Sequence, residues 1–428
     1  MPAVSDPIAR LLAGTYPDPE TGELLACESR VVAIEDSLVG REIELVAATG
    51  VAGKLAVIGD PDTYVALGDR VAAALEARFA VQRIELPRHP HCDRTTIDKL
   101  IATLEPDVAA VVAVGSGTIN DLSKMVALAR DIPQLVFGTA PSMNGYTSVS
   151  ASVSEAGFKR SVRARTPVGV FLDLGVLAAA PARLIRAGLG DSVCRPTAQA
   201  DWLMAHLLRD RPYRAVPFEL LAADEPTLFS NAAALVGGDL AAMRSLARTL
   251  VLSGFGMTLV GGSFPASQGE HMISHYLEMM RPAHIPEPLH GEQIAVATIA
   301  VARIQAELLA RAEPPYVQPT AISRDSVVAH FGPAFGDAAW PELSAKALDR
   351  AAADAINARL AAHWPEFRSR LAAVATTPDR VAAILNAAGA PTTPIELGYP
   401  DALFDAAIAH AREIRDRYTF LDLAGDRV

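Results

Sequence analysis

The sequence predicts an α/β fold, with an N-terminal parallel-sheet domain over residues 1–180 and an all-helical C-terminal domain over residues 181–428. Short apolar runs alternate with helical segments in the first 180 residues, and these runs are apolar almost throughout. That combination is typical of a parallel sheet with both faces covered by helices. After Pro181 the chain changes to long stretches rich in alanine and leucine, with few strand-like runs, which favour helices.

Five apolar runs in the first domain are predicted strands. Helical spacing of apolar residues predicts a helix over TYVALGDRVAAALEARF, between the first two strands, and another over INDLSKMVALARD, between the third and fourth. The predicted strands are KLAVIGD (Lys54–Asp60), RIELP (Arg83–Pro87), AAVVAVGSG (Ala109–Gly117), QLVFGTAP (Gln134–Pro141) and GVFLDL (Gly169–Leu174).

The composition limits the class of partner. The chain has 428 residues, 50% hydrophobic and 20% charged, which is enough to bury a large core in a soluble globular protein. A net charge of −11 argues against nucleic-acid binding, which depends on clustered lysine and arginine. We therefore expect a small-molecule partner and no nucleic acid.

Cysteine usage and hydropathy predict a cytoplasmic protein without membrane insertion. Cys27, Cys92 and Cys194 lie far apart and form no CxxC pair, so neither a disulfide framework nor a thiolate zinc site is expected. The apolar runs are too short or too interrupted to span a bilayer, and the first residues lack the apolar character of a signal peptide.

A glycine-containing turn follows the third predicted strand. The strand runs into Gly115, Ser116 and Gly117, and a helix then opens with Thr118. Glycines let backbone N–H groups approach an anion, and a helix N-terminus adds the positive end of its dipole, which suits a dinucleotide pyrophosphate. The pattern is not GxGxxG, because Asn120 stands at the place of the third glycine. A plain tight turn is the alternative.

The fourth predicted strand also ends in a polar turn. Thr139, Ser142, Asn144, Thr147 and Ser148 follow it, and such side chains suit a ribose, a carboxamide or a substrate. The alternative is an ordinary loop whose hydroxyls bond to its own backbone. Two polar turns after successive strands favour a ligand site, because parallel sheets bind ligands at the carboxyl ends of their strands.

Candidate metal ligands lie in the second half. His271 and His275 are four residues apart, so a helix would carry both on one face. The HExxH motif of metalloproteases is not matched, because Glu270 precedes His271 instead of following it. Asp191 after two glycines and His290 ahead of a helix would complete a divalent site with open positions. The alternatives are histidines with polar contacts in a helical core and a helix N-cap at Asp191.

Several longer stretches carry a family resemblance. They are GSGTINDLSK, TAPSMNGYTS, the GFK at Gly157–Lys159, AGLGD, GGSFPASQGEHMISHYLEM, LHGEQ and AREIRDRYTFLDLA. Together they resemble the sn-glycerol-1-phosphate dehydrogenase family, especially its bacterial branch, from about Lys54 to the C-terminus. That family belongs to the superfamily of iron-containing alcohol dehydrogenases, glycerol dehydrogenase and dehydroquinate synthase.

The resemblance implies a Rossmann-like NAD(P)-binding domain followed by an all-helical, metal- and substrate-binding domain, an arrangement that is dehydroquinate synthase-like. It implies a homo-oligomeric, metal-dependent oxidoreductase that reduces dihydroxyacetone phosphate to sn-glycerol 1-phosphate in phospholipid metabolism. The implied cofactors are NAD(H) or NADP(H) and one divalent metal, which is zinc, nickel or iron.

The resemblance also implies site residues. The metal ligands match Asp191, His271 and His290, and His275 would line the substrate pocket one helical turn away and join them in catalysis. Substrate contacts match Asn144 and Asp191. The nucleotide contacts match Asp60, Gly115, Ser116, Gly117, Thr118, Ile119, Thr139, Ala140, Pro141, Ser142 and Ser148.

Asn144 departs from the family pattern, which generally has aspartate in a PSMDGY-like motif. Asparagine can hydrogen-bond a hydroxyl, but it cannot accept a proton or carry negative charge, so the exact substrate stays open. A dehydrogenase of another polyol or alcohol, a dehydroquinate synthase-like cyclase that needs only catalytic NAD, and a binding-only relative without turnover are the alternatives.

A basic cluster follows the second polar turn. We expect Lys159 to anchor the substrate phosphate and Arg160, Arg163 and Arg165 to form a solvated face.

Overall fold

The computed structural model describes residues 6–155 and 158–427, and contacts divide the chain into two compact units. The first comprises Met1–Ser192 and Arg214–Ser263, and the second comprises Val193–Tyr213 and Phe264–Val428. Helices beyond residue 180 thus pack with the sheet, as where α13 (Leu240–Leu259) contacts β3 (Val31–Glu35). Units defined by packing need not coincide with domains defined by the ligands they bind. The predicted division at residue 180, between a nucleotide-binding and a metal-binding domain, therefore stays a prediction.

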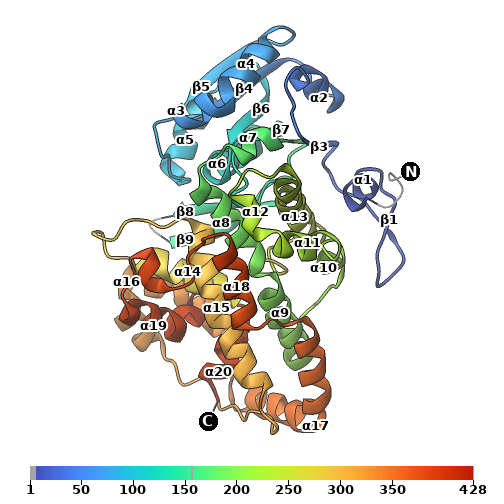
Figure 1. Cartoon of the computed structure of the whole chain (residues 1–428). Helices are drawn as coiled ribbons and strands as arrows, with labels where there is room; N and C mark the ends of the chain where they lie inside the picture. Colours follow the sequence, from blue (N-terminus) through green and yellow to red (C-terminus); the bar gives the residue numbers. More distant parts are fainter. Residues whose placement is uncertain (1–5, 156–157, 428) are drawn as a thin grey trace. The chain divides into compact units, whose positions relative to one another are not determined.

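A six-stranded parallel sheet lies at the centre of the first unit (Figure 1). Its strand order is β3-β10-β7-β6-β4-β5, and every pairing is parallel. The five predicted strands are confirmed, although β5 begins two residues earlier than predicted. The strands beside β3 are β4 (Lys54–Gly59), β5 (Val81–Glu85), β6 (Val108–Gly115), β7 (Gln134–Gly138) and β10 (Gly169–Asp173).

Some strands of the first unit were not predicted. β3 is an edge strand that pairs with β10, and most of its residues are only partly buried. Two antiparallel hairpins, β1 (Tyr16–Pro17) with β2 (Leu24–Leu25) and β8 (Ser150–Glu155) with β9 (Phe158–Arg163), lie outside the main sheet. The sequences SASVSE and FKRSVR lack the continuous apolar run by which the buried strands are found.

The helices of the first unit confirm the predicted alternation with one irregularity. Between β4 and β5 the helical stretch is divided into α3 (Pro61–Thr63), a π-helical turn η1 (Tyr64–Gly68) and α4 (Asp69–Glu76). The second predicted helix is α6 (Gly117–Arg130). The remaining helices are α1 (Pro7–Leu12), α2 (Glu42–Ala48), α5 (Arg94–Thr103), α7 (Leu174–Ala178), α8 (Ala182–Val193), α10 (Val216–Glu219), α11 (Asp224–Ser230) and α12 (Ala232–Leu235).

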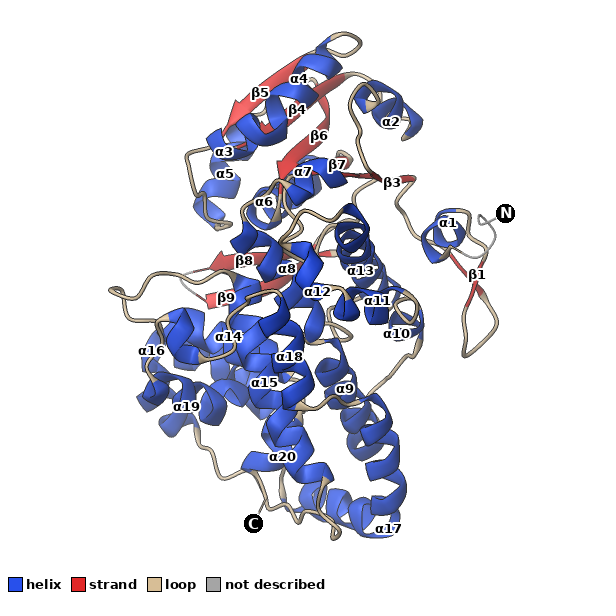
Figure 2. Cartoon of the chain, viewed as in Figure 1, coloured by secondary structure: helices blue, strands red, loops and turns tan. Residues whose placement is uncertain are grey.

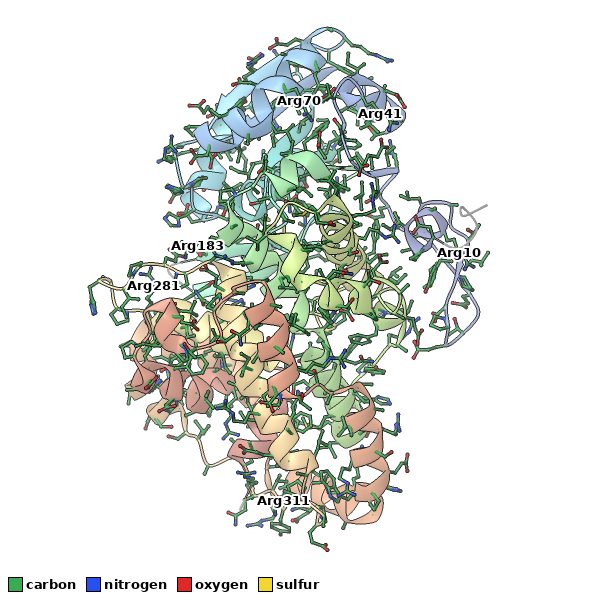
Figure 3. All side chains as sticks on the ribbon, viewed as in Figure 1. Arg10, Arg41, Arg70, Arg183, Arg281 and Arg311 are labelled. Atoms are coloured by element: carbon green, nitrogen blue, oxygen red, sulfur yellow. The ribbon has the colours of Figure 1, made fainter. Side chains whose placement is uncertain are left out.

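An arginine on α4, Arg70, joins three elements of this unit (Figure 3). Its Nε lies 3.0 Å from Glu42 Oε1 on α2, and its Nη2 lies 2.8 Å from Asp173 Oδ2 at the end of β10. Both carboxylates are buried, so the guanidinium neutralises charges that burial alone would disfavour.

The second unit is helical in the described residues, as predicted (Figure 2). Buried apolar residues of its helices gather into two clusters, one around Tyr276 and the other around Trp364. None of the described helices of the whole chain combines the length and apolarity that a membrane crossing requires. The helices are α9 (Arg195–Arg209), α14 (Gly269–Met280), α15 (His290–Leu309), α16 (Arg324–Ser344), α17 (Arg350–Val374), α18 (Pro378–Ala387), η2 (Pro394–Leu397), α19 (Asp401–His410), η3 (Ala411–Ile414) and α20 (Phe420–Gly425).

Candidate active site

The strand order places a switch point between β4 and β6. The chain passes from β4 outward to β5 and then returns past β4 to form β6. Open parallel sheets bind ligands at the carboxyl ends of the strands where the direction of winding reverses. Asp60 follows β4 and the turn at Gly115 follows β6, so two of the predicted nucleotide-binding segments lie at this point.

The two glycines at the turn between β6 and α6 have different structural roles. A Cβ on Gly115 would lie 2.5 Å from Ile119 Cβ, so packing alone requires glycine at that position. A Cβ on Gly117 would meet only Met143 Cγ at 3.5 Å, which is an ordinary contact. Ser116, the N-cap of α6, makes no side-chain cap hydrogen bond. The start of α6 therefore has the form expected of an anion-binding helix terminus.

Asp60 has a structural role in addition to the predicted one. Its Oδ1 accepts a hydrogen bond from Thr63 N at 2.8 Å, and its own N–H donates to Thr63 Oγ1 at 2.8 Å. This is a capping box at the start of α3. The contact with a ribose stays a prediction.

Polar side chains of the loop after β7 bond mainly to backbone. Thr147 Oγ1 donates to Val251 O at 2.6 Å, and Ser148 Oγ contacts Ser150 O at 2.9 Å. The Tyr146 hydroxyl donates to Ala140 O at 2.6 Å. Thr139 N donates to Gly115 O at 3.2 Å and so connects the two polar turns. These hydroxyls shape the loop, and ligand contacts of Thr139, Ala140, Pro141, Ser142 and Ser148 stay predictions.

Lys124 supports this loop and was not found from the sequence. It is fully buried in α6, and its Nζ lies 2.6 Å from Gly145 O, 2.8 Å from Ser148 O and 3.0 Å from Ser150 O. Burial lowers the pKa of this amine to about 8. The sequence offered one clue to this role, since Lys124 lies four residues after Asn120 and so on the same face of α6. The Nδ2 of Asn120 also contacts Gly145 O, at 3.4 Å.

Asp191 lies near the end of α8, so the alternative of a helix N-cap at this residue was wrong. The preceding glycines do not open the helix. A Cβ on Gly188 would lie 1.6 Å from Pro141 O, so this glycine allows the loop after β7 to touch the helix. Asp191 Oδ2 then accepts a hydrogen bond from Asn144 N at 2.9 Å. The two stretches AGLGD and PSMNG, far apart in sequence, are thereby neighbours.

Both histidines of the HxxxH pair lie on α14 and are buried. Their ring centroids are 6.3 Å apart, as expected for neighbours on one helical face. His271 Nδ1 lies 2.9 Å from Glu270 Oε1, and His275 Nδ1 lies 2.9 Å from Arg415 Nη2. Because arginine only donates, His275 Nδ1 must accept, which assigns the proton of the neutral ring to Nε2.

His290 completes a cluster of three imidazoles. It is the first residue of α15, and its ring centroid lies 5.1 Å from that of His271 and 6.1 Å from that of His275. Its Nδ1 lies 3.5 Å from Ser274 Oγ and 3.7 Å from Glu278 Oε1. Polar groups thus face Nδ1 of both His271 and His290, an arrangement that orients Nε2 of each ring for a metal.

The chain's donor set fits a divalent metal. Among the described residues, Asp191, His271 and His290 each offer one ligand atom within 4.8 Å of the other two. One carboxylate and two imidazoles are ligands that zinc and its first-row neighbours accept, and they leave positions open for a substrate. This group does not include His275, and the assignment of the ligands stays a prediction.

A second group, Cys194, Glu270 and His271, also has ligand atoms within 4.8 Å of one another. Since His271 Nδ1 already bonds to Glu270, we interpret that carboxylate as the support of a ligand and not as a ligand itself.

Two buried carboxylates, one on α14 and one on α9, bond to the start of α14 and were not assigned a role from the sequence. Glu270 Oε1 accepts from Gln268 N at 2.8 Å, and Asp201 accepts from Gly269 N at 3.0 Å and Phe420 N at 2.9 Å. Burial raises the pKa of each to about 7. They anchor the segment that carries His271.

The basic cluster is only partly described. Lys159 lies on β9 opposite Ser154, and its side chain, like Gly157, lies outside the described residues. Arg165 pairs with Asp131 at 2.6 Å with more than half of its side chain exposed, as expected for a solvated face.

Similarity to known proteins decides the family. A family model of iron-containing alcohol dehydrogenases matches residues 33–181. The glycerol-1-phosphate dehydrogenase [NAD(P)+] of Thermococcus kodakarensis is 31% identical over 277 residues, which cover 64% of this chain and 77% of that protein. The chain belongs to the glycerol-1-phosphate dehydrogenase family. It is therefore an NAD(P)-linked oxidoreductase.

Other relatives agree with this family. The glycerol-1-phosphate dehydrogenase [NAD(P)+] of Geobacillus stearothermophilus is 28% identical over 407 residues, which cover 91% of this chain and 92% of that protein. The crystal structure of glycerol dehydrogenase from Schizosaccharomyces pombe matches with a TM-score of 0.62 at 15% identity, covering 93% of this chain and 87% of that chain. The latter likeness supports the fold of this dehydrogenase.

Proposed function

We propose that this dehydrogenase reduces dihydroxyacetone phosphate to sn-glycerol 1-phosphate with NADH or NADPH. The observation that carries the proposal is the cluster of His271, His275 and His290 in a member of the glycerol-1-phosphate dehydrogenase family. Two of these rings have polar groups at Nδ1 that prepare Nε2 for a metal, and the third presents a proton.

Asp191, His271 and His290 would hold one divalent metal, which is zinc, nickel or iron. When bound, the metal supplies Lewis acidity toward the substrate carbonyl, and the nicotinamide supplies the hydride. Glu270 fixes the ring of His271 through Nδ1, and Ser274 with Glu278 does so for His290. Buried partners of this kind keep ligands in one orientation and raise their basicity.

His275 would donate a hydrogen bond to the substrate oxygen that becomes the new hydroxyl, and the proton that completes this hydroxyl would come from water, with His275 in the relay. Its Nδ1 accepts from Arg415, so the proton resides on Nε2. Asn144, whose N–H holds Asp191, would hydrogen-bond a substrate hydroxyl through its side chain.

The first unit would bind the nucleotide largely through backbone. The uncapped N–H groups at the start of α6 suit the pyrophosphate, and Asp60 after β4 suits the ribose hydroxyls. Asp60 would favour NADH, because a carboxylate beside the ribose repels a 2′-phosphate, but it would not exclude NADPH.

The test measures oxidation of NADH and NADPH by protein reconstituted in parallel with zinc, nickel or iron. Dihydroxyacetone phosphate and dihydroxyacetone are the two substrates, and His290→Ala is the control. We expect fast oxidation that needs both the phosphate and His290. Oxidation with dihydroxyacetone alone would make the protein a polyol dehydrogenase, and no oxidation with either would overturn the proposal.

A further inference from the structure

Three arginines lie close together near the C-terminus, and two of them have structural partners. Arg412 forms an ion pair with Asp426 at 2.8 Å and donates to Asp422 O at 3.2 Å. The guanidinium of Arg417 donates to Ser267 O, and its Cζ lies 4.6 Å from the centroid of the Phe264 ring. Both residues therefore serve the packing of the second unit.

Arg415 differs, because its hydrogen-bond partner is an imidazole. Nη2 donates to His275 Nδ1 at 2.9 Å, and in the described part of the chain no carboxylate lies within ion-pair distance of this guanidinium. Glu342, Asp416 and Glu278 act on it only from farther away. Arg70, by contrast, contacts two buried carboxylates.

The surroundings of Arg415 favour an anionic ligand. Burial lowers the pKa of the guanidinium, so the group lies in a medium of low polarity where an unpaired cation is costly. The residue as a whole is nevertheless partly exposed. Guanidinium has five N–H donors in a planar fork, and the bond to His275 uses one of them.

The position of Arg415 relates this cation to the histidine cluster. It contacts His275, whose ring centroid lies 6.3 Å from that of His271 and 6.1 Å from that of His290. A short substrate whose carbonyl lies at His271 and His290 would have its far end within reach of the guanidinium.

We propose that Arg415 is the phosphate anchor of the active site, with a phosphate monoester as the recognised group. This inference rests on the proposed function, and it gives Arg415 the anchoring role that was expected of Lys159. The bidentate fork of arginine matches two phosphate oxygens, and the bond to His275 holds that fork in place. Arg415 thus selects the phosphorylated substrate and positions the ring of His275 at the same time.

The first experiment compares kcat/KM for dihydroxyacetone phosphate and dihydroxyacetone in the metal-loaded wild type, Arg415→Gln, Arg415→Lys and Lys159→Met. Glutamine can still donate to His275 Nδ1, and a loss of support for His275 would lower both rates alike. We expect the ratio of the two kcat/KM values to fall about 100-fold in R415Q and about tenfold in R415K, which keeps the charge but lacks the fork. Arg324→Gln, an exposed arginine of the same unit, should leave the ratio unchanged.

The second measurement needs neither metal nor turnover. The thermal midpoint of the metal-free protein is recorded with sn-glycerol 1-phosphate and with glycerol. We expect the phosphate ester to raise the midpoint of the wild type and of R324Q, and this shift to be absent in R415Q.

The outcomes separate this inference from the proposed function. A wild type that reduces dihydroxyacetone phosphate, with R415Q and R415K unchanged in ratio and thermal shift, overturns the anchor and leaves the function intact. If K159M alone loses both the preference for the phosphorylated substrate and the thermal shift, Arg415 is not the anchor. If the wild type reduces neither substrate, the proposed function is wrong. The thermal shifts of the wild type and R415Q then show whether Arg415 binds the phosphate ester. Should R415Q not fold, R415K decides.

Discussion

The two units of the molecule use polar side chains differently. In the first unit, Lys124, Thr147 and Ser148 bond to backbone and make the loop after β7 a scaffold. In the second, the Nδ1 atoms of the three histidines face other side chains, which orients each ring for a ligand. Nucleotide recognition should therefore depend on backbone shape, whereas metal binding and chemistry should depend on oriented imidazoles.

The largest expected effect is in the second unit. His290→Ala should lower kcat by at least about 1,000-fold, because loss of a metal ligand removes several kcal/mol at about 1.4 kcal/mol per tenfold. Steady-state kinetics and metal content measure this. The control is His284→Ala, an exposed histidine six residues earlier, which should behave as wild type. Equal metal content and activity in H290A would contradict the assignment.

The support of His271 should matter less than the ligand itself. Glu270→Gln should weaken metal affinity about 10–100-fold, because glutamine lacks the charge that orients and polarises the ring. Competition with a chromophoric chelator gives the affinity. Glu307→Gln, at an exposed position on α15, is the matched control. Wild-type affinity in E270Q would show that Glu270 serves only the packing of α14.

A glycine pair tests the backbone-based site of the first unit. Gly117→Ala should raise KM for the nucleotide about tenfold with little change in stability, because its Cβ has space in the protein but would lie at the anion-binding terminus. Gly115→Ala should instead destabilise the fold by about 1–3 kcal/mol, because its Cβ overlaps Ile119. Chemical unfolding and nucleotide kinetics separate the two effects. An unchanged KM in G117A would place the pyrophosphate elsewhere.

The smallest effect concerns pH and the scaffold. Burial lowers the pKa of Lys124 to about 8 from an ordinary value of 10.5. Between these values the unfolded chain binds more protons than the native one, so the contribution of Lys124 to stability rises with pH from about 8 to 10.5. Below pH 8 Lys124 is protonated in both states, so its contribution to stability does not change with pH. Urea unfolding of wild type and Lys124→Met should therefore diverge across this window, whereas the exposed variant Lys99→Met should run parallel to wild type.

Much of the architecture was predictable because its signals are local. Continuous apolar runs identify β4, β6, β7 and β10, since a strand buried on both faces has no polar alternation. The spacing of His271 and His275 places both rings on one helical face, because the helix repeats every 3.6 residues. The edge strand β3 and the polar hairpins escaped prediction, since partial exposure removes the apolar run.

By itself, the sequence determined the order of strands and helices, the polar turns after β6 and β7, and the types of side chain available for a metal. The tertiary structure decided which of these side chains meet. Asp191 accepts a hydrogen bond from Asn144 N because Gly188 admits the Pro141 carbonyl, and Lys124 lies beneath a loop more than 20 residues away. Arg415 contacts His275 across 140 residues. Such partners have no local signature, since their contact depends on how the helices pack and not on any spacing along the chain.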